Sequence, residues 1–298
     1  MLDELHILKQ LLPSLPQNAG VVTGPGDDCA ALAWFGGRVL LAAVDQVVGN
    51  IHYDRDATSP EAAGRKLMCR NLSDIAAMGG VPKWALLAVA AGGRNPDWVL
   101  AFCRGAADAG KQYGVAVVGG DLAGQPGDGE TASLTILGEA EEKKLLLRSG
   151  AHPGDALYVT GTIGNSFASG HHLDFEPRLE EGKFLAENGF ASAMLDVSDG
   201  LLLDAKRLAE ASRLRLRIDP GAVPLRAGAA RERAFSDGED YELLFTVPAG
   251  KEAELIQKWK LTKLTTLTRI GVAESGSPDV CDPSGNSLLS KGKCGYEH

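Results

Sequence analysis

Aspartate residues beside glycines or at the ends of apolar segments recur along this chain. The stretch GPGDDCAAL places Asp27 and Asp28 side by side after a Gly-Pro-Gly turn. Converging carboxylates repel one another, and divalent cations such as Mg²⁺ relieve this because they take oxygen ligands and bridge carboxylates to phosphates. The residue types therefore point to a magnesium–nucleotide site. Besides Asp28, the candidate aspartates are Asp45, Asp74, Asp121, Asp196 and Asp199.

Each of these residues also has an ordinary structural interpretation. Asp28 suits a plain turn, because aspartate next to glycine is common there. Asp74 lies inside a predicted helix, four residues after Arg70, where an ion pair on a solvated face is the usual arrangement. Ser198 or Asp199 would suit the cap of the helix that follows them. The functional interpretation therefore depends on the aspartates acting together.

Motifs of several other enzyme classes are absent from the sequence. The phosphate-binding pattern GxxxxGK[ST] does not occur, and the glycine-bearing segment VTGTIGNS at 159–166 lacks its lysine. We interpret that segment as a turn between a strand and a helix. GxGxxG, HExxH and GxSxG are also missing, so hydrolysis by a serine nucleophile has no support.

The bulk composition favours a globular protein of one large or two ordinary domains. The chain has 298 residues, of which 44% are hydrophobic, and a formal net charge of −9, which disfavours nucleic acid as the main partner. No apolar run approaches the roughly 18 residues of a membrane helix, and the segment MLDELHILKQLL lacks the basic start of a signal peptide. Five scattered cysteines without a CxxC pair suit reduced thiols. We therefore expect a cytoplasmic protein without a membrane partner.

Helices and strands are mixed in both halves of the chain. Ser59 and Pro60 are typical of the start of a helix that ends at the glycines near position 80, and Asn95 and Pro96 begin a second helix that ends at Gly114. A short amphipathic helix is predicted within 1–18, with strands over 37–48, 83–91, 115–121 and 132–140, the third running into a glycine turn. Later elements are a strand at 156–161, a strand–turn–helix unit over 192–212, a strand at 241–248 and a helix at 250–260.

This mixture predicts an α/β or α+β protein with two domains. A turn at Pro153-Gly154-Asp155 begins what we interpret as the second unit, so the boundary is placed near residue 145. The two predicted domains are 1–145 and 146–298.

Seven segments occur in a fixed order that is more specific than any one of them. They are GPGDDCAAL, VDQVVGNIHY, GRKLMCRNLSDIAAMGG, VVGGD, LRSGAHPGDALYVTGTIG, LDVSDGLLLD and SDGEDYELLFT. Together they resemble the thiamine-monophosphate kinases, which belong to a superfamily with aminoimidazole ribonucleotide synthetase, selenophosphate synthetase and the hydrogenase maturation factor HypE. The resemblance extends from about Gly24 to the closing CGYEH.

The resemblance implies a PurM-like fold, with an N-terminal ATP- and Mg-binding α/β domain that dimerises through its sheet and a C-terminal α/β domain. The nucleotide and several Mg²⁺ ions would lie between the domains. The implied reaction moves the γ-phosphate of ATP onto thiamine monophosphate, giving thiamine diphosphate. The transfer is direct and in line, so no covalent or general-base residue is expected, and catalysis rests on positioning and charge neutralisation.

The resemblance also implies roles for particular residues. The magnesium ligands would be Asp28, Asp45, Asp74, Asp121, Asp196 and Asp199. The nucleotide contacts would be Gly120, Asp121, Arg148 and Ser198. The substrate contacts would be His52, Glu239 and Tyr296. As alternatives, Arg148 suits a surface arginine before a turn, and His52 suits an ordinary core or surface histidine.

Three departures from the family pattern leave alternatives open. Ala43 and Val44 stand where the family has Ser or Thr oxygens beside a metal, and Asp237 replaces a glycine. The stretch at 164–179 is shorter than usual and contains His171 and His172. A same-fold enzyme with another small acceptor, or a non-catalytic nucleotide-binding protein, therefore stands beside the kinase interpretation.

Overall fold

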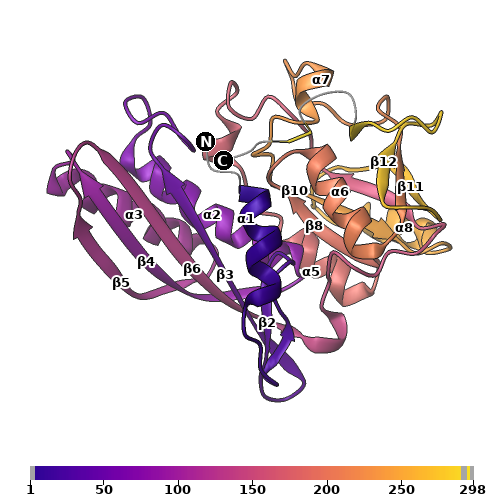
Figure 1. Cartoon of the computed structure of the whole chain (residues 1–298), viewed down its shortest axis with the longest axis horizontal. Helices are drawn as coiled ribbons and strands as arrows, with labels where there is room; N and C mark the ends of the chain where they lie inside the picture. Colours follow the sequence, from indigo (N-terminus) through magenta and orange to yellow (C-terminus); the bar gives the residue numbers. More distant parts are fainter. Residues whose placement is uncertain (1–3, 290–293, 296–298) are drawn as a thin grey trace.

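Two six-stranded sheets, each with helices packed on it, form the molecule (Figure 1). The structure is a computed structural model, and it describes residues 4–289 and 294–295. The mixed α/β fold in two units agrees with the sequence-based prediction. Within the described part of the chain, no helix has both the length and the apolar character needed to cross a membrane.

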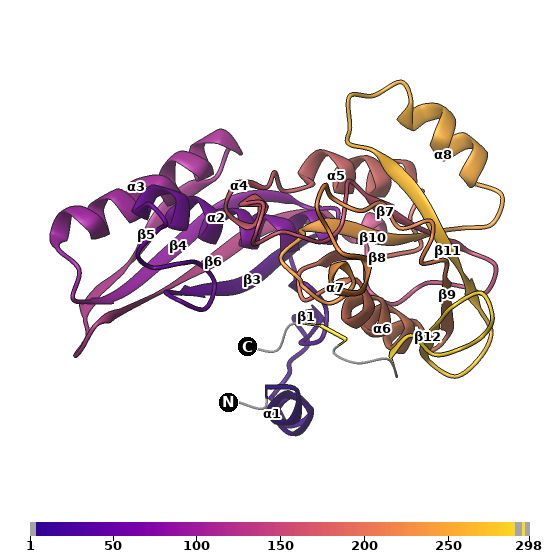
Figure 2. The ribbon, with the colours of Figure 1, turned by 90° about the horizontal axis from the view of Figure 1, so that it is seen from above.

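The first sheet has the strand order β1-β2-β3-β6-β4-β5, and all its pairs are antiparallel except the parallel pair β4–β5. Figure 2 shows α2 and α3 together over one face of this sheet. The strands are β1 (Val21–Thr23), β2 (Ala30–Ala33), β3 (Arg38–Val48), β4 (Val81–Gly92), β5 (Ala116–Gly124) and β6 (Gly129–Glu141). The helices of this part are α1 (Glu4–Leu11), α2 (Pro60–Ala77) and α3 (Pro96–Gln112), with 3₁₀ turns at Leu12–Ser14 and Glu142–Lys144.

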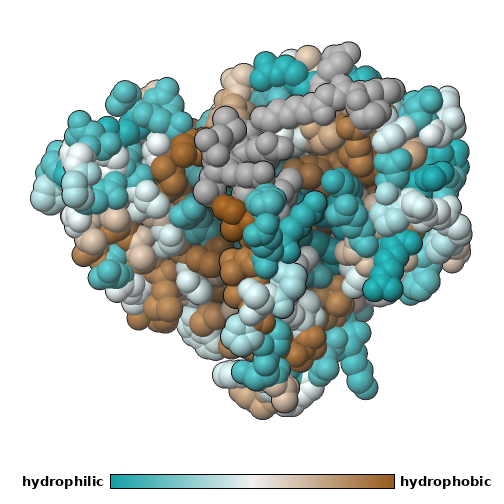
Figure 3. Space-filling view, in the orientation of Figure 1, coloured by the Kyte–Doolittle hydropathy of each residue, from teal (hydrophilic) through white to brown (hydrophobic). Residues whose placement is uncertain are grey.

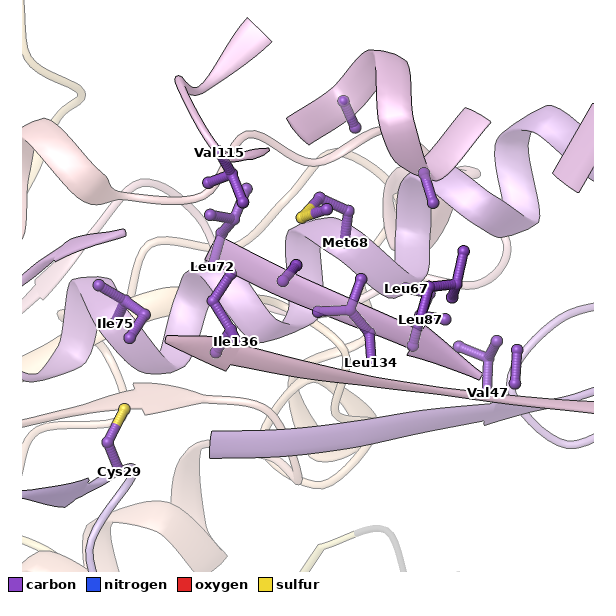
Figure 4. Packing of buried hydrophobic residues seen from close by; sticks show 14 of the residues in the cluster. Cys29, Val47, Leu67, Met68, Leu72, Ile75, Leu87, Val115, Leu134 and Ile136 are labelled. Atoms are coloured by element: carbon purple, nitrogen blue, oxygen red, sulfur yellow. The ribbon is translucent and has the colours of Figure 1, made fainter. Parts of the chain in front are cut away.

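Both long helices begin at the predicted caps. The Ser59 side chain accepts a hydrogen bond from the backbone N–H of Ala62 at 3.2 Å, and Asn95 accepts one from Trp98 at 2.8 Å. Proline follows each cap at the first helical position, where its missing N–H costs nothing. The α2 residues Met68, Leu72 and Ile75 then pack on Leu87, Leu134 and Ile136 of the sheet (Figure 4).

Helices α2 and α3 approach each other closely through glycines. A Cβ atom at Gly64 would lie 2.0 Å from the backbone carbonyl oxygen of Phe102, so the contact admits no side chain. Gly64→Ala is expected to lower the free energy of unfolding by about 1–3 kcal/mol through overpacking, as measured by urea unfolding. Gly129→Ala is the matched control, because the nearest atom to its Cβ is a flexible glutamine side chain at 3.4 Å. Equal stability of both variants would contradict this packing.

The second sheet has the strand order β12-β9-β11-β7-β10-β8. One face packs on α6 and the other on α5 and α8, as two separate apolar clusters show (Figure 2). Its strands are β7 (Ala156–Thr160), β8 (Ala193–Val197), β9 (Arg215–Ile218), β10 (Glu242–Val247), β11 (Leu267–Glu274) and β12 (Asp279–Cys281). Its helices are α4 (His171–Asp174), α5 (Leu179–Asn188), α6 (Leu201–Ser212), α7 (Arg231–Ala234) and α8 (Glu252–Trp259).

The short helix predicted within 1–18 is confirmed as α1, which ends at Leu11, directly before the 3₁₀ turn that contains Pro13. Another local prediction needs correction. The glycine turn predicted at GGD is strand, because β5 continues to Gly124 alongside β4. The predicted domain boundary at 145 lies between β6, which ends at Glu141, and β7, which begins at Ala156, and stays a prediction.

Candidate functional site

A cleft of about 710 Å³ lies where the first sheet meets the second. Its wall comes from α1, the turn after β1, the part of β3 that extends beyond its pairing with β2, helix α2, and the segments around β7 and β8. The polar residues that line it are Asp27, Asp28, Asp45, Gln46, His52, Arg70, Asp74, Arg148, Asp196, Ser198, Asp199, Arg207, Tyr241 and Lys9. Most of the predicted site residues therefore gather in one place.

Three carboxylates form the centre of this cleft. Asp28 follows the glycine turn, Asp74 lies on α2, and Asp196 lies on β8, and one oxygen atom from each is within 4.8 Å of the others. Asp196 also accepts a hydrogen bond from the hydroxyl of Ser73 at 2.5 Å. The structure thus brings together carboxylates that are up to 168 positions apart, from both sheets.

The charges of this cluster oppose one another. Burial, together with the charges of Asp45, Asp196 and Asp28, raises the pKa of Asp74 well above its ordinary value. Burial and the charge of Asp28 likewise raise the pKa of Asp196, against the effect of the Ser73 hydrogen bond. Charged forms of all three residues are therefore costly until a cation joins them.

The donor set fits a hard divalent cation. The Asp28 Oδ2 atom is buried and accepts no hydrogen bond within the described residues, so it has an unused lone pair at the cluster. Carboxylate oxygens are the ligands that Mg²⁺ prefers, and phosphate groups commonly complete its shell. Asp28, Asp74 and Asp196 would hold such an ion.

The affinity of this cluster for Mg²⁺ is expected to fall as the pH is lowered from 8 to 6. Protons compete with the cation for carboxylates whose pKa values are raised, as those of Asp74 and Asp196 are. Each proton that the cation displaces weakens the affinity by up to about tenfold for every pH unit below the pKa of the carboxyl group that it leaves. Titration calorimetry in two buffers with different ionisation enthalpies measures the proton release directly. An affinity that is constant between pH 6 and 8, without proton release, would contradict a competition between protons and Mg²⁺ for Asp74 and Asp196.

Arg148, at the beginning of the second unit, forms hydrogen bonds with the glycine turn that carries Asp27 and Asp28 in the first unit. Its backbone N–H donates to both Asp27 oxygens at 3.2 Å, and its Nη2 donates to Asp28 Oδ1 at 2.6 Å. Burial and the neighbouring Asp28 raise the pKa of Asp27 to about 6. Asp27 therefore anchors the turn, and Asp28 is the member of the pair that faces the cluster.

The turn after β8 carries Ser198 and Asp199 on the cleft wall. The backbone N–H groups of Ser198, Asp199 and Gly200 all donate to Asp204 Oδ2, at 3.0–3.2 Å. Asp199 itself forms an ion pair with Arg207 at 2.7 Å. The cap interpretation of Ser198 or Asp199 is therefore wrong, because Asp204, one turn into α6, satisfies the free N–H groups.

Asp45 lies on β3 and is paired with Arg70 of α2, with 3.1 Å between Arg70 Nε and Asp45 Oδ2. The alternative of a solvated ion pair between Arg70 and Asp74 is wrong. Helix α2 is buried along most of its length, because it contacts the first sheet, α3, α5 and β8. Arg70 and Asp74 therefore face the cleft and not open solvent.

Two of the predicted substrate residues, His52 and Glu239, lie close together through Lys66. His52 lines the cleft, and its Nδ1 atom accepts a hydrogen bond from the backbone N–H of Val48 at 3.0 Å. Glu239 is buried behind this wall and binds Lys66 Nζ at 2.6 Å, a nitrogen that also donates to the His52 carbonyl oxygen. Tyr296 lies outside the described residues.

Gly120 and Asp121 are not among the residues that line the cleft. Asp121 is paired with Ala88 of β4, which is exposed on the sheet face opposite α2 and α3. Paired residues share a face, so Asp121 lies on that open face too. Gly120 lies against β4, where a Cβ would be 1.7 Å from the Leu87 carbonyl oxygen. Their predicted contacts with nucleotide and metal stay predictions.

Sequence reasoning missed four polar residues of this region: Arg70, Lys66, Asp204 and Arg207. The spacing of Asp204 and Arg207, three residues apart on one helix face, was the available signal for that pair. Arg70 and Lys66 have partners on distant strands and loops, which the sequence does not reveal.

The chain matches both domains of the AIR synthase related proteins, the N-terminal domain over residues 26–140 and the C-terminal domain over residues 169–280. A thiamine-monophosphate kinase of Rhodopirellula baltica is 37% identical over 287 residues, covering 90% of this chain and 87% of that protein. One of Bacillus subtilis is 30% identical over 326 residues, covering 100% of this chain and 99% of that protein.

Solved structures agree with this relationship. Thiamine monophosphate kinase from Aquifex aeolicus has a TM-score of 0.80 at 28% identity, covering 97% of this chain and 99% of that one. The structure described as AaThiL complexed with AMPPCP and TMP has a TM-score of 0.77 at 28% identity, covering 98% and 96%. The Escherichia coli protein HypE, at 16% identity and a TM-score of 0.69, shares the fold. With relatives at 30–37% identity over nearly all of its length, the chain belongs to the thiamine-monophosphate kinase family.

Proposed function

We propose that this protein transfers the γ-phosphate of ATP to thiamine monophosphate, giving thiamine diphosphate and ADP, in a Mg²⁺-dependent reaction. The observation that carries the proposal is the Asp28–Asp74–Asp196 cluster inside the cleft of a chain that belongs to this kinase family. A close structural relative is described in complex with an ATP analogue and TMP, which supports the same pair of substrates here.

Asp28, Asp74 and Asp196 are the proposed ligands of the metal, with Asp199 as a further candidate at the cleft wall. Bound there, Mg²⁺ would neutralise phosphate charge and orient the transferring group. Arg148 and Arg207 lie at the edge of the cleft and each carries a guanidinium suited to phosphate oxygens. The phosphate of thiamine monophosphate already carries anionic oxygens, so these residues position it and no side chain needs to remove a proton.

His52 and Glu239 are the proposed contacts for the acceptor, and Tyr296 is the predicted aromatic contact. His52 is held by its hydrogen bond with Val48 and by the packing of its loop over Lys66. Burial alone would raise the pKa of Glu239. The positive charges of Lys66 and Arg70 outweigh this effect and hold the pKa below its ordinary value. Glu239 therefore stays ionised beside Lys66 and Arg70.

We also propose a homodimer formed through the open face of the first sheet. Large apolar side chains are exposed there, among them Leu86 and Val118, the latter 59% exposed. Figure 3 shows hydrophobic residues on the lower and inner part of the left lobe, where this sheet lies. Exposed apolar surface of this kind is typical of an interface.

Leu86→Glu is expected to halve the mass of the particle, to the 31.3 kDa of one chain, because a charge on β4 would be buried unpaired in the dimer. Light scattering after size-exclusion chromatography measures the mass. Leu261→Glu is the matched control, since Leu261 is exposed on the second unit. A wild-type protein that elutes as a monomer would contradict the dimer.

The kinase proposal is tested by incubating the protein with ATP, Mg²⁺ and thiamine monophosphate and separating the products by chromatography. Thiamine diphosphate is expected in a one-to-one ratio with ADP. Omission of Mg²⁺ should stop the reaction, and thiamine without phosphate should be a poor acceptor. ADP formation that depends on a different acceptor would favour a same-fold enzyme with another substrate, and nucleotide binding without turnover would favour a non-catalytic protein.

A further inference from the structure

The Asp45 end of the cleft carries its own cations. Arg70 from α2 contacts Asp45 through Nε at 3.1 Å and Nη2 at 3.5 Å, and its Nη1 lies 3.9 Å from Glu239 Oε1. Lys66 contacts Glu239 at 2.6 Å on its other oxygen. Two carboxylates and two cations thus balance one another there, whereas the Asp28–Asp74–Asp196 cluster has an excess of negative charge.

The wall beside Asp45 offers little else to a metal ion. Ala43 and Val44, which precede Asp45 on β3, both line the cleft and carry no side-chain oxygen. Gln46 offers only a neutral amide oxygen, and Asp74, whose charge interacts with that of Asp45, already belongs to the three-carboxylate cluster. Mg²⁺ requires near-octahedral coordination by oxygen, so Asp45 is a poor start for a further site as long as Arg70 engages its carboxylate. The same carboxylate, in contrast, matches the planar fork of a guanidinium.

Asp45 is held against α2 at two points. Its backbone N–H donates to Asn71 Oδ1 at 3.1 Å, and its side chain accepts from the neighbouring Arg70. Arg70 is also set apart from the other cleft arginines by burial, since its side chain is 8% exposed against 20% for Arg148 and 26% for Arg207. If Arg70 moved away, the negative charges of Asp45 and Glu239 would lose a nearby positive charge in a poorly solvated environment, which is costly.

We propose that Arg70 acts as a fixed cation in place of one divalent ion at Asp45. The inference rests on the proposed function, because it concerns how this site neutralises a nucleotide and its acceptor. It replaces the sequence-based prediction that Asp45 is a metal ligand. Metal binding is then confined to the side of the cleft that holds Asp28, Asp74 and Asp196, and Arg70 is a positioning residue that supplies constant charge at the other side.

The test counts Mn²⁺ ions by electron paramagnetic resonance, with the intact protein and a non-hydrolysable ATP analogue, and needs no catalysis. Asp45→Asn is expected to bind as many ions as wild type, whereas Asp74→Asn should lose at least one ion or bind at least tenfold more weakly. Arg70→Met should bind one ion more than wild type, because Asp45 is released. Arg70→Lys, which keeps the charge, should bind the wild-type number, and adding Asp45→Asn to Arg70→Met should remove the extra ion.

Each contrary result overturns the inference. Loss of an ion in Asp45→Asn would make Asp45 a ligand, and a wild-type count in folded Arg70→Met would show that Arg70 excludes no ion. If circular dichroism shows that Arg70→Met does not fold, the Asp45→Asn count decides alone. Wild-type protein that binds no Mn²⁺ with nucleotide would overturn the proposed function and this inference together, whereas contrary counts in the variants alone leave the kinase proposal standing.

Discussion

Asp74→Asn is expected to reduce thiamine diphosphate formation by at least about 1000-fold, equivalent to about 4 kcal/mol of transition-state stabilisation. Asp74 lies at the centre of the three-carboxylate cluster, and the amide removes both a negative charge and an anionic ligand. Asparagine has nearly the same shape, so α2 should keep its packing. Initial rates of product formation at saturating Mg²⁺ and ATP measure the effect.

The same substitution should not destabilise the protein when Mg²⁺ is absent. Burial and neighbouring carboxylates make the charge of Asp74 costly, so its removal is expected to leave the melting temperature unchanged or higher. The increase in melting temperature on adding Mg²⁺ should disappear. Asp108→Asn, on the exposed face of α3, is the matched control and should behave as wild type. Wild-type activity and a normal Mg²⁺ response in Asp74→Asn would show that Asp74 is not a ligand.

Lys66→Met is expected to lower the free energy of unfolding by about 3–5 kcal/mol, because it leaves Glu239 buried without its nearest cation. The two charged atoms are 2.6 Å apart, and both side chains are almost completely buried. Arg70, at 3.9 Å, is too distant to replace the lost hydrogen bond. Urea unfolding followed by tryptophan fluorescence measures the change.

Two further variants distinguish the effect of breaking the buried Lys66–Glu239 ion pair from the effect of simply losing a positive charge. Lys66→Met combined with Glu239→Gln should recover much of the lost stability, because no unpaired charge remains. Lys206→Met breaks the exposed Lys206–Glu210 pair on α6 and should change the free energy of unfolding by less than about 0.5 kcal/mol. A Lys66→Met variant as stable as Lys206→Met would contradict the buried ion pair.

Local signals in the sequence were sufficient for the elements that position the site. Caps and prolines act within one helical turn, so the starts of α2 and α3 were predicted correctly at Ser59 and Asn95. The ordered motifs were sufficient for the family and for most cleft residues. Asp28, Asp74 and Asp196 do meet, although each alone suited an ordinary turn, helix or strand position.

Interactions between distant segments were beyond the reach of sequence reasoning. Arg70 and Asp74 have the spacing of a surface ion pair, yet Arg70 binds Asp45 because α2 is enclosed by its neighbours. The glycines of GGD suggested a turn, but pairing with β4 extends the strand through Asp121. In both cases tertiary contacts overrode a local preference of small free energy.

The origin of the three clustered carboxylates has a consequence for how the molecule is assembled. Asp28 and Asp74 belong to the first sheet and its helix, whereas Asp196 lies on β8, the edge strand of the second sheet. An ion held by all three is therefore a removable cross-link between the two sheets, in addition to the packing of α2 on α5. Its binding free energy adds to their docking, so rising Mg²⁺ should make the two halves unfold as one cooperative unit. A chelator should lower that cooperativity.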